Sequence, residues 1–212
     1  MAEREYVSNV VIRRLPLYYR YLETLEREGV LRISSSELGG QMGFTASQVR
    51  QDINCFGAFG QQGYGYNVKE LKNHLGSILG LNNGYHMIVI GVGNIGQAII
   101  NYQSFYDRGF EIRALFDASP KRIGTEIRGM IVRDVKGMEE YLRQNRVDIA
   151  AICTPRDCAQ QIADVLVDNG VRGLWNFAPV VLKAPEHVAV NHVHMTDSLM
   201  VLSYMLKHSE QK

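Results

Sequence analysis

Apolar residues near the N-terminus recur at helical spacing, at Val11, Leu15, Tyr18, Leu22 and Leu25. These intervals of three and four residues predict an amphipathic helix from about Asn9 to Glu28, which Gly29 ends. Beyond Met87 the pattern changes, because short β-branched runs alternate with helical stretches, as in parallel sheets built from βαβ units. The polar turn formers after Leu79 mark the change, so we predict an α/β chain with two domains, residues 1–82 and 83–212.

The middle of the first domain contains two predicted helices joined by a glycine turn. A short helix from Glu37 to Met42 follows a run of serines, and Gly43 ends it. Thr45 and Gln48 have the spacing of a capping box and begin a third helix, which runs to about Phe56. Two such helices in succession are typical of a helix-turn-helix.

The third helix has an apolar face and a polar face. Val49, Ile53 and Phe56 are spaced to face the core. The polar face consists of Ser47, Arg50, Gln51 and Asn54. In the major groove Arg suits guanine, Gln and Asn suit adenine, and Ser suits a phosphate or either base. A solvated helix face is the plainer alternative and stays open at this point.

Glycine alternates with aromatic and polar residues between Gly57 and Tyr66. This alternation favours a tight β-ribbon, and a ribbon directly after a DNA-reading helix is interpreted as the wing of a winged helix. Gln61, Gln62 and Tyr64 are its candidate DNA contacts. A hairpin that only packs against the domain is the alternative, and the absence of Lys or Arg at positions 61 and 62 predicts few phosphate contacts there.

The second domain begins with the signature of a dinucleotide-binding fold. A strand over His86–Ile90 is followed by Gly91-Val92-Gly93-Asn94-Ile95-Gly96 and a helix predicted from Gln97 to about Phe105. The glycines turn the chain, admit a pyrophosphate and let helix and strand pack, while the amides at the helix start attract phosphate. Asp117, which ends the next strand about 20 residues after Gly96, is placed to bind the adenine ribose and favours NAD(H) over NADP(H).

Two further strands are predicted over Asp148–Ile152 and Gly173–Trp175, with a helix from about Arg156 to Val167 between them. Thr154 and Pro155 follow the first of these strands, and Asn176 follows the second. Because open α/β sheets bind ligands at the carboxyl ends of their strands, these three residues are candidate cofactor contacts. Ordinary turn punctuation is the alternative explanation.

Composition narrows the possible functions. The 212 residues carry 23 Lys and Arg against 22 Asp and Glu, so the net charge of +1 gives no global indication of nucleic-acid binding. No apolar run approaches the roughly 18 residues of a membrane span and no signal peptide is evident, so we expect a cytoplasmic protein without a membrane partner. Neither the cysteines nor the histidines have convincing metal-ligand or catalytic spacing; they are Cys55, Cys153, Cys158, His187, His192 and His194.

The last predicted helix, from Thr196 to about Lys207, is rich in leucine and methionine. A terminal helix this apolar needs a partner surface, which is either its own sheet or a second subunit. The second arrangement fits a homodimer that binds a two-fold symmetric DNA site.

Four segments taken together, Thr45–Asp52, Phe56–Tyr66, Gly91–Gly96 and Asn176–Leu182, resemble the Rex family of bacterial redox-sensing transcriptional repressors. The resemblance extends over about Val11 to Lys207. It implies a winged helix-turn-helix domain followed by a Rossmann-like domain, in a homodimer that binds palindromic operator DNA. It further implies that NADH, but not NAD+, releases the DNA, and that the helix over residues 196–207 is swapped between subunits.

The same resemblance implies roles for single residues. Tyr102 matches a family tyrosine close to the nicotinamide, and Arg20 matches an arginine that pairs with an acid near the final helix. Here His194 stands where that acid is usual, and Asp197 is a possible substitute one turn later. Gln51 stands where many members have Lys, which together with the glutamines of the ribbon implies a different operator sequence and a shallower salt dependence.

The sequence therefore predicts a non-enzymatic, NADH-sensing repressor. An NAD-dependent Rossmann oxidoreductase with an N-terminal interaction module is the first alternative. A regulator that responds through one of the three thiols is the second.

Overall fold

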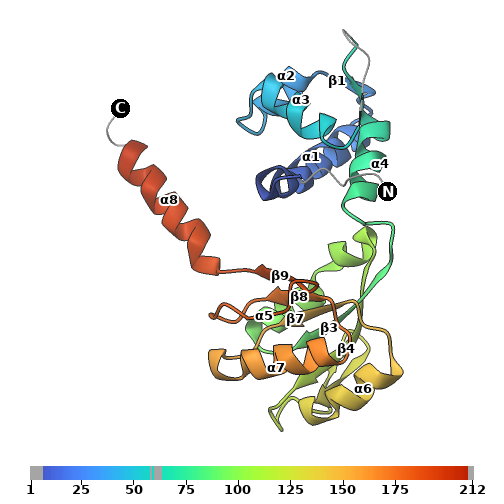
Figure 1. Ribbon diagram of the computed structural model, residues 1–212, viewed down its shortest axis with the longest axis vertical. Coiled ribbons are helices and arrows are strands. Elements are labelled where there is room, and N and C mark those ends of the chain that lie inside the picture. The colour runs from blue at the N-terminus through green and yellow to red at the C-terminus, as the bar shows by residue number, and fades with distance from the viewer. Residues whose placement is uncertain (1–6, 58, 60–63, 210–212) are drawn as a thin grey trace. The chain divides into compact units, whose positions relative to one another are not determined.

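The computed structural model describes residues 7–57, 59 and 64–209, and the chain divides into two compact units, residues 1–83 and 84–212 (Figure 1). The elements of the first unit are α1 (Asn9–Arg27), β1 (Arg32–Ile33), α2 (Ser35–Gly40), α3 (Ala46–Asn54), β2 (Tyr66–Asn67) and α4 (Val68–Ile78). β1 and β2 pair antiparallel. Each helix has a side-chain cap at its start, provided by Ser8, Ser34, Thr45 and Asn67.

One apolar cluster holds the four helices of the first unit together. Leu15, Tyr18 and Leu22 of α1 are at most 1% exposed and pack with Leu38 of α2, Val49 and Ile53 of α3 and Leu75 of α4. The helical spacing of α1 and α3 was therefore correctly interpreted. The predicted bounds of α2 were wrong, because the helix begins and ends two residues earlier: Ser34 and Glu37 form the capping box that fixes its start.

The second unit is a seven-stranded sheet with helices on both faces. Its strands are β3 (Tyr85–Ile90), β4 (Phe110–Asp117), β5 (Glu126–Ile127), β6 (Met130–Asp134), β7 (Ile149–Ile152), β8 (Gly173–Asn176) and β9 (Ala189–His192). Its helices are α5 (Asn94–Asn101), η1 (Gln103–Arg108), η2 (Val135–Gly137), α6 (Met138–Gln144), α7 (Arg156–Asp168) and α8 (Met195–Ser209). The spatial order is β5-β6-β4-β3-β7-β8-β9, and all pairs are parallel except β5 with β6.

Alternating residues of β3 build two cores, one on each face of the sheet. Ile88 and Ile90 pack with apolar residues of α6 and α7, whereas Met87 and Val89 pack with Ile99 and Ile100 of α5. The strand order reverses beside β3, whose neighbours are β4 and β7. In open α/β sheets this switch point opens a crevice at the carboxyl ends of the strands, which is where the glycine loop after β3 lies.

Two boundaries of the glycine-loop helix were predicted wrongly. α5 begins at Asn94, inside the glycine motif, and ends at Asn101 instead of near Phe105. It ends there because Tyr102 adopts an extended backbone (φ −81°, ψ 99°), after which η1 begins at Gln103. The consequence is that Tyr102 lies at a break between two helices and not within one.

Candidate cofactor and nucleic-acid sites

The glycine loop is shaped by contacts that admit no side chain. A Cβ on Gly91, whose φ is +89°, would lie 2.5 Å from the carbonyl oxygen of Cys153, and one on Gly96 would lie 2.0 Å from the carbonyl oxygen of Gly91. Gly93 precedes α5 without a side-chain cap, so the amides of the first helical turn are left for another acceptor. This arrangement is a ready anion site at the switch point of the sheet.

Asp117 anchors this loop from the end of β4. Its Oδ2 accepts a 2.7 Å hydrogen bond from the amide of Val92 and lies 3.3 Å from Nη1 of Arg122, while its Oδ1 accepts a 2.8 Å bond from the amide of Ser119. Burial alone would raise the pKa of Asp117, but the hydrogen bonds from Ser119, Val92 and Arg122 outweigh it and lower the pKa below its ordinary value. The carboxylate is therefore ionised and fixed at neutral pH.

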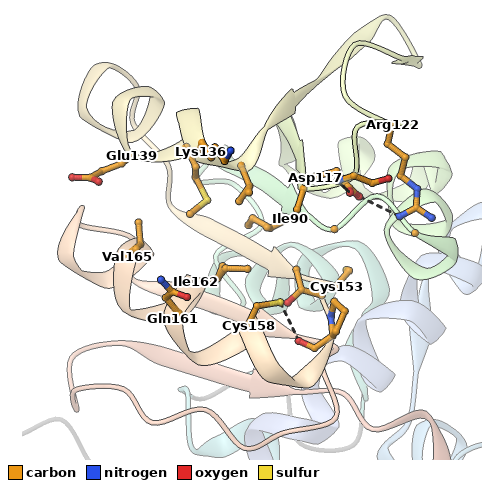
Figure 2. Close-up of a pocket in the computed structure, with 18 residues that line it drawn as sticks. Ile90, Asp117, Arg122, Lys136, Glu139, Cys153, Cys158, Gln161, Ile162 and Val165 are labelled. Carbon is orange, nitrogen blue, oxygen red and sulfur yellow. Dashed lines mark hydrogen bonds and ion pairs between the residues drawn. The ribbon is translucent and has the colours of Figure 1, made fainter.

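A cavity of about 840 Å³ opens beside the loop (Figure 2). Five residues predicted to bind a cofactor line it: Gly91, Gly93, Asp117, Thr154 and Pro155. On the side away from the glycines the lining combines apolar Met138, Ile162 and Val165 with polar Lys136, Glu139 and Gln161 (Figure 2). A cavity with a phosphate-binding loop at one end and a mixture of apolar and polar side chains at the other has the character of a nucleotide site.

One polar atom in the cavity wall is orphaned. The hydroxyl oxygen of Thr154 is buried and has no hydrogen-bond partner within the described part of the chain. Buried hydroxyls normally have a partner, so this atom points to a ligand that completes the site. Together with the loop that only glycine can form, it shows that the residues present fit a bound dinucleotide.

The other predicted cofactor residues lie outside the cavity lining. Val92, Asn94, Ile95 and Gly96 belong to the loop and the first turn of α5, and the side chain of Tyr102 is 54% exposed. Asn176 is completely buried: its amide nitrogen donates to the carbonyl oxygens of Ala178 and Val180 and lies 3.0 Å from Nδ1 of His192. Its side chain therefore shapes the loop after β8.

The first unit presents the expected polar helix face. Val49 and Ile53 of α3 are buried, and the hydroxyl of Thr45 accepts a 3.1 Å bond from the amide of Gln48. The candidate DNA-reading side chains of α3 are all exposed: Ser47, Arg50, Gln51 and Asn54. Arg50 also donates a 3.0 Å hydrogen bond to the hydroxyl of Ser35, in the first turn of α2.

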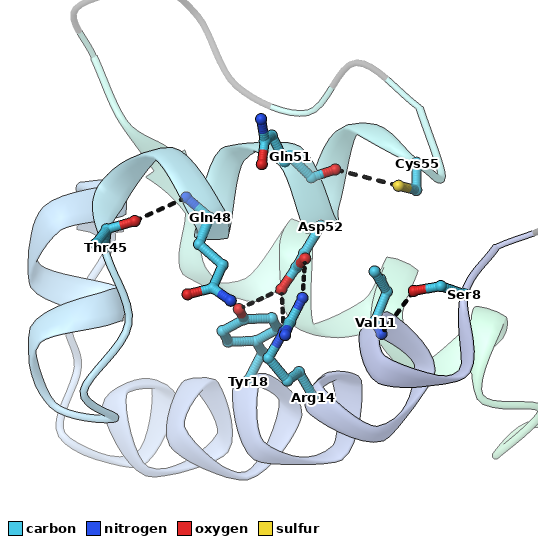
Figure 3. Close-up of polar contacts among 9 residues, drawn as sticks. All are labelled: Ser8, Val11, Arg14, Tyr18, Thr45, Gln48, Gln51, Asp52 and Cys55. Carbon is cyan, nitrogen blue, oxygen red and sulfur yellow. Dashed lines mark hydrogen bonds and ion pairs between the residues drawn. The ribbon is translucent and has the colours of Figure 1, made fainter.

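A buried ion pair behind this face was not predicted from the sequence. Asp52 is 2% exposed and accepts 2.6 Å bonds from both Nε and Nη2 of Arg14, and a 2.7 Å bond from the hydroxyl of Tyr18 (Figure 3). The hydrogen bond with Asp52 raises the pKa of the Arg14 guanidinium, and burial followed by the same carboxylate raises the pKa of Tyr18. These three bonds tie α3 to α1.

The remaining predicted residues are described unit by unit. Gln61 and Gln62 lie outside the described residues, whereas Tyr64 is 69% exposed and its carbonyl accepts a 3.2 Å bond from Arg32. Arg20 is exposed on α1 in the first unit.

In the second unit, His194 is half-buried beside His192, with parallel rings 6.2 Å apart, and Asp197 is exposed at the start of α8. The described residues contain no cluster of three or more metal-ligating side chains. No helix in the described ranges is long and apolar enough to cross a membrane.

Comparisons with known proteins match both units. A model of the CoA binding domain matches residues 82–180, and a model described as the N-terminus of a putative DNA-binding protein matches residues 6–54. The redox-sensing transcriptional repressor Rex of Clostridium beijerinckii is 54% identical over 210 residues, which cover 99% of this chain and all of that protein.

Solved structures agree with these matches along nearly the whole chain. A crystal structure of RSP in complex with beta-NAD+ and operator DNA superimposes with a TM-score of 0.91 and 52% identity over 98% of this chain and 95% of that chain. A structure of RSP in complex with beta-NADH gives the same TM-score at 49% identity, over 98% of this chain and 97% of that one.

Proposed function

The chain belongs to the Rex family of redox-sensing transcriptional repressors, and from that premise we propose that it reads operator DNA with α3 and leaves the operator when NADH binds the second unit. The observation that supports this best is that one chain combines a recognition helix, α3, whose polar face is exposed, with a cavity suited to a dinucleotide. Relatives over the full length are named as repressors, so the oxidoreductase alternative is set aside.

DNA recognition is assigned to the exposed face of α3. Arg50 is suited to guanine, Gln51 and Asn54 to adenine, and Ser47 to a phosphate or a base edge. The bond from Arg50 to Ser35 holds the guanidinium at the helix turn, so less side-chain freedom is lost when it meets a base. Tyr64, with the glutamines before it, is assigned to the wing.

The dinucleotide is assigned to the cavity of the second unit. The loop from Gly91 to Gly96 and the free amides of α5 would hold the pyrophosphate, and Asp117 would accept from the ribose hydroxyls. The apolar side chains from α6 and α7 would enclose the adenine, and Thr154 would gain its missing partner. Tyr102, by its family resemblance, is placed near the nicotinamide.

Release from DNA requires a difference in affinity. NADH moves the protein off the operator only if it binds the DNA-incompetent form more tightly than the competent form, whereas a ligand with equal affinity for both changes nothing. We assign the report of nicotinamide state to Tyr102, and the switch to Arg20 with either His194 or Asp197.

We further propose a homodimer assembled through α8. All described residues of this helix are exposed, including Leu199, Leu202 and Leu206, each at least 50% exposed. A leucine-rich helix whose described residues are all exposed needs a second copy to cover it, and a two-fold dimer matches a palindromic operator. Because the operator lies on the bacterial chromosome, we place the protein in the cytoplasm.

The test begins with selection of bound duplexes from random-sequence DNA in the presence of NAD+, followed by challenge with NADH. We expect a palindrome that NADH releases and NAD+ does not. Arg50→Ala should weaken operator binding by about 1–3 kcal/mol without changing NADH affinity. Arg27→Ala, which removes an exposed arginine of α1, is the charge-matched control. Selection of no sequence despite tight NADH binding would contradict the proposed function.

A further inference from the structure

Arg128 has a strained backbone conformation in the turn between β5 and β6. It is the one non-glycine residue with positive φ in the described ranges, at 51°, and is followed by Gly129 at φ 79°. The pairing of Ile127 with Met130 leaves these two residues as the whole turn between β5 and β6. Such turns favour Asn-Gly, because positive φ brings Cβ too close to the following carbonyl oxygen, a cost that Asn offsets with local hydrogen bonds from its short polar side chain and an arginine does not. An arginine at this position points to a role for its side chain.

The guanidinium of Arg128 reaches the break between α5 and η1. Its Nη1 donates to the carbonyl oxygen of Asn101, and its Nη2 donates to the side-chain oxygen of Gln103, both at 3.2 Å. α5 has no basic residue of its own in its last turn, so Arg128 supplies the cation that the negative end of a helix favours. The two bonds hold the residues immediately before and after Tyr102.

Tyr102 stands at the end of a row of aromatic rings. Its ring centroid is 4.9 Å from that of Phe105, which lies 5.6 Å from Trp175, which in turn lies 4.6 Å from Phe177. Trp175 and Phe177 flank the carboxyl end of β8, at the edge of the sheet where the glycine loop lies. Tyr102 is 54% exposed, so its own packing does little to fix its position.

We propose that Arg128 is a positioning residue for nicotinamide recognition: by clamping Asn101 and Gln103 it holds Tyr102 in the extended conformation that presents its ring to the reduced nicotinamide. The inference rests on the proposed placement of the nicotinamide beside Tyr102. It assigns selectivity for NADH over NAD+ to a hairpin turn that does not line the nucleotide cavity.

The test uses a variant that keeps the turn and removes only the side chain. Arg128→Gly adopts positive φ without strain, so the hairpin is retained. Arg128→Lys keeps the charge but lacks the two-pronged donor geometry. Arg113→Gln, which removes an exposed arginine of β4 paired with Glu111, is the matched control. NADH affinity of the full-length protein is measured by fluorescence, and NAD+ and ADP affinities by competition against NADH.

We expect Arg128→Gly to weaken NADH roughly 3- to 10-fold, the loss that one or two hydrogen bonds predict, and to reduce the preference for NADH over NAD+. ADP, which probes only the adenosine half, should bind within about twofold of the wild type, a margin below the effect of one hydrogen bond. Arg128→Lys should fall between, and the control should match the wild type. In a Tyr102→Ala background, Arg128→Gly should have no further effect, because the two residues act together.

Three results would overturn the inference: wild-type NADH affinity and selectivity in Arg128→Gly, an equal loss of ADP and NADH, or the same loss with and without Tyr102. The proposed function is judged separately, from the wild type in the same titrations. A wild-type protein without preference for NADH over NAD+ would refute the proposed function and this inference with it. A selective wild type with an equally selective Arg128→Gly refutes the inference alone.

Discussion

Replacement of Asp52 by alanine should show how much the Asp52 ion pair contributes to fixing the recognition helix α3 against α1. The carboxylate is buried in α3 and receives two bonds from Arg14 and one from Tyr18. Its removal leaves the guanidinium, whose side chain is 15% exposed, without its counter-charge and the tyrosine hydroxyl without an acceptor. The loss falls on the contact between α1 and α3 while the exposed DNA-facing side chains stay unchanged.

The expected cost follows from burial and from the number of bonds lost. Breaking a buried ion pair by removing one partner costs about 3–5 kcal/mol, and the partial exposure of Arg14 favours the lower end. Tyr18→Phe removes one hydrogen bond to a charged group and should cost about 1.5–3 kcal/mol. A unit of this size has a free energy of unfolding of about 4–12 kcal/mol, so Asp52→Ala removes a large share of it.

Unfolding in urea can assign this loss to the first unit. The single tryptophan, Trp175, lies in the second unit, so its fluorescence follows that unit, whereas circular dichroism follows the helices of both. We expect Asp52→Ala to lower the urea midpoint of the circular-dichroism transition that belongs to the first unit. The midpoint of the Trp175 fluorescence transition should stay unchanged.

Glu26→Ala is the control that leaves α3 untouched, because it breaks the less buried ion pair between Glu26 of α1 and Lys72 of α4. It should cost less and spare operator affinity, whereas Asp52→Ala should weaken operator binding even where the protein is fully folded. A cost below about 1 kcal/mol, the net value of one ordinary hydrogen bond, would refute the reasoning.

Two further predictions concern the nucleotide cavity. Because the pKa of Asp117 is lowered in the folded protein, the stability it contributes is present above its ordinary value of 3.8 and is lost as the pH falls through the lower, folded value. In denaturation followed by Trp175 fluorescence, the free energies of unfolding of the wild type and Asp117→Asn should therefore converge below pH 3.8. A difference in free energy that stays constant down to acid unfolding would contradict this prediction. NADH at ten times its dissociation constant should slow maleimide labelling of Cys158, which lines the cavity, by about tenfold, and should leave exposed Cys55 unaffected. Cys153 also lines the cavity, but burial raises its pKa to about 12, so maleimide should label it slowly. Equal protection of Cys55 and Cys158 would argue against a site in the cavity.

Local patterns in the sequence predicted the elements that depend on neighbouring residues. Thr45 caps α3 as its spacing with Gln48 indicates, and the alternation of buried and exposed positions along α3 follows from helical periodicity. The strand and glycine loop before α5 were recognised from local spacing, and Gly96 is required by the carbonyl oxygen of Gly91, five residues earlier. Gly91 is required by the carbonyl oxygen of Cys153, which follows the neighbouring strand β7.

Features that depend on distant partners could not be predicted in this way. Asp52 stands among polar residues of α3 and looks like another surface position, since Arg14, which justifies its burial, is 38 residues away. The early end of α5 was missed because Asn101 and Tyr102 carry no strong helix-breaking signal, and the arginine that holds this break comes from a turn 27 residues later. Long-range side-chain pairing therefore set the limit of the sequence prediction.

The separate cores of the two units have a genetic consequence. The helices of the first unit share one apolar cluster, and the sheet of the second is covered by two others. On the proposed function, a substitution that melts the first core abolishes repression, so the target genes are expressed constitutively. A substitution confined to the second site leaves a repressor that does not respond to NADH, and the target genes stay silent when NADH accumulates. Loss-of-function alleles of this single gene should thus sort by position into two opposite phenotypes.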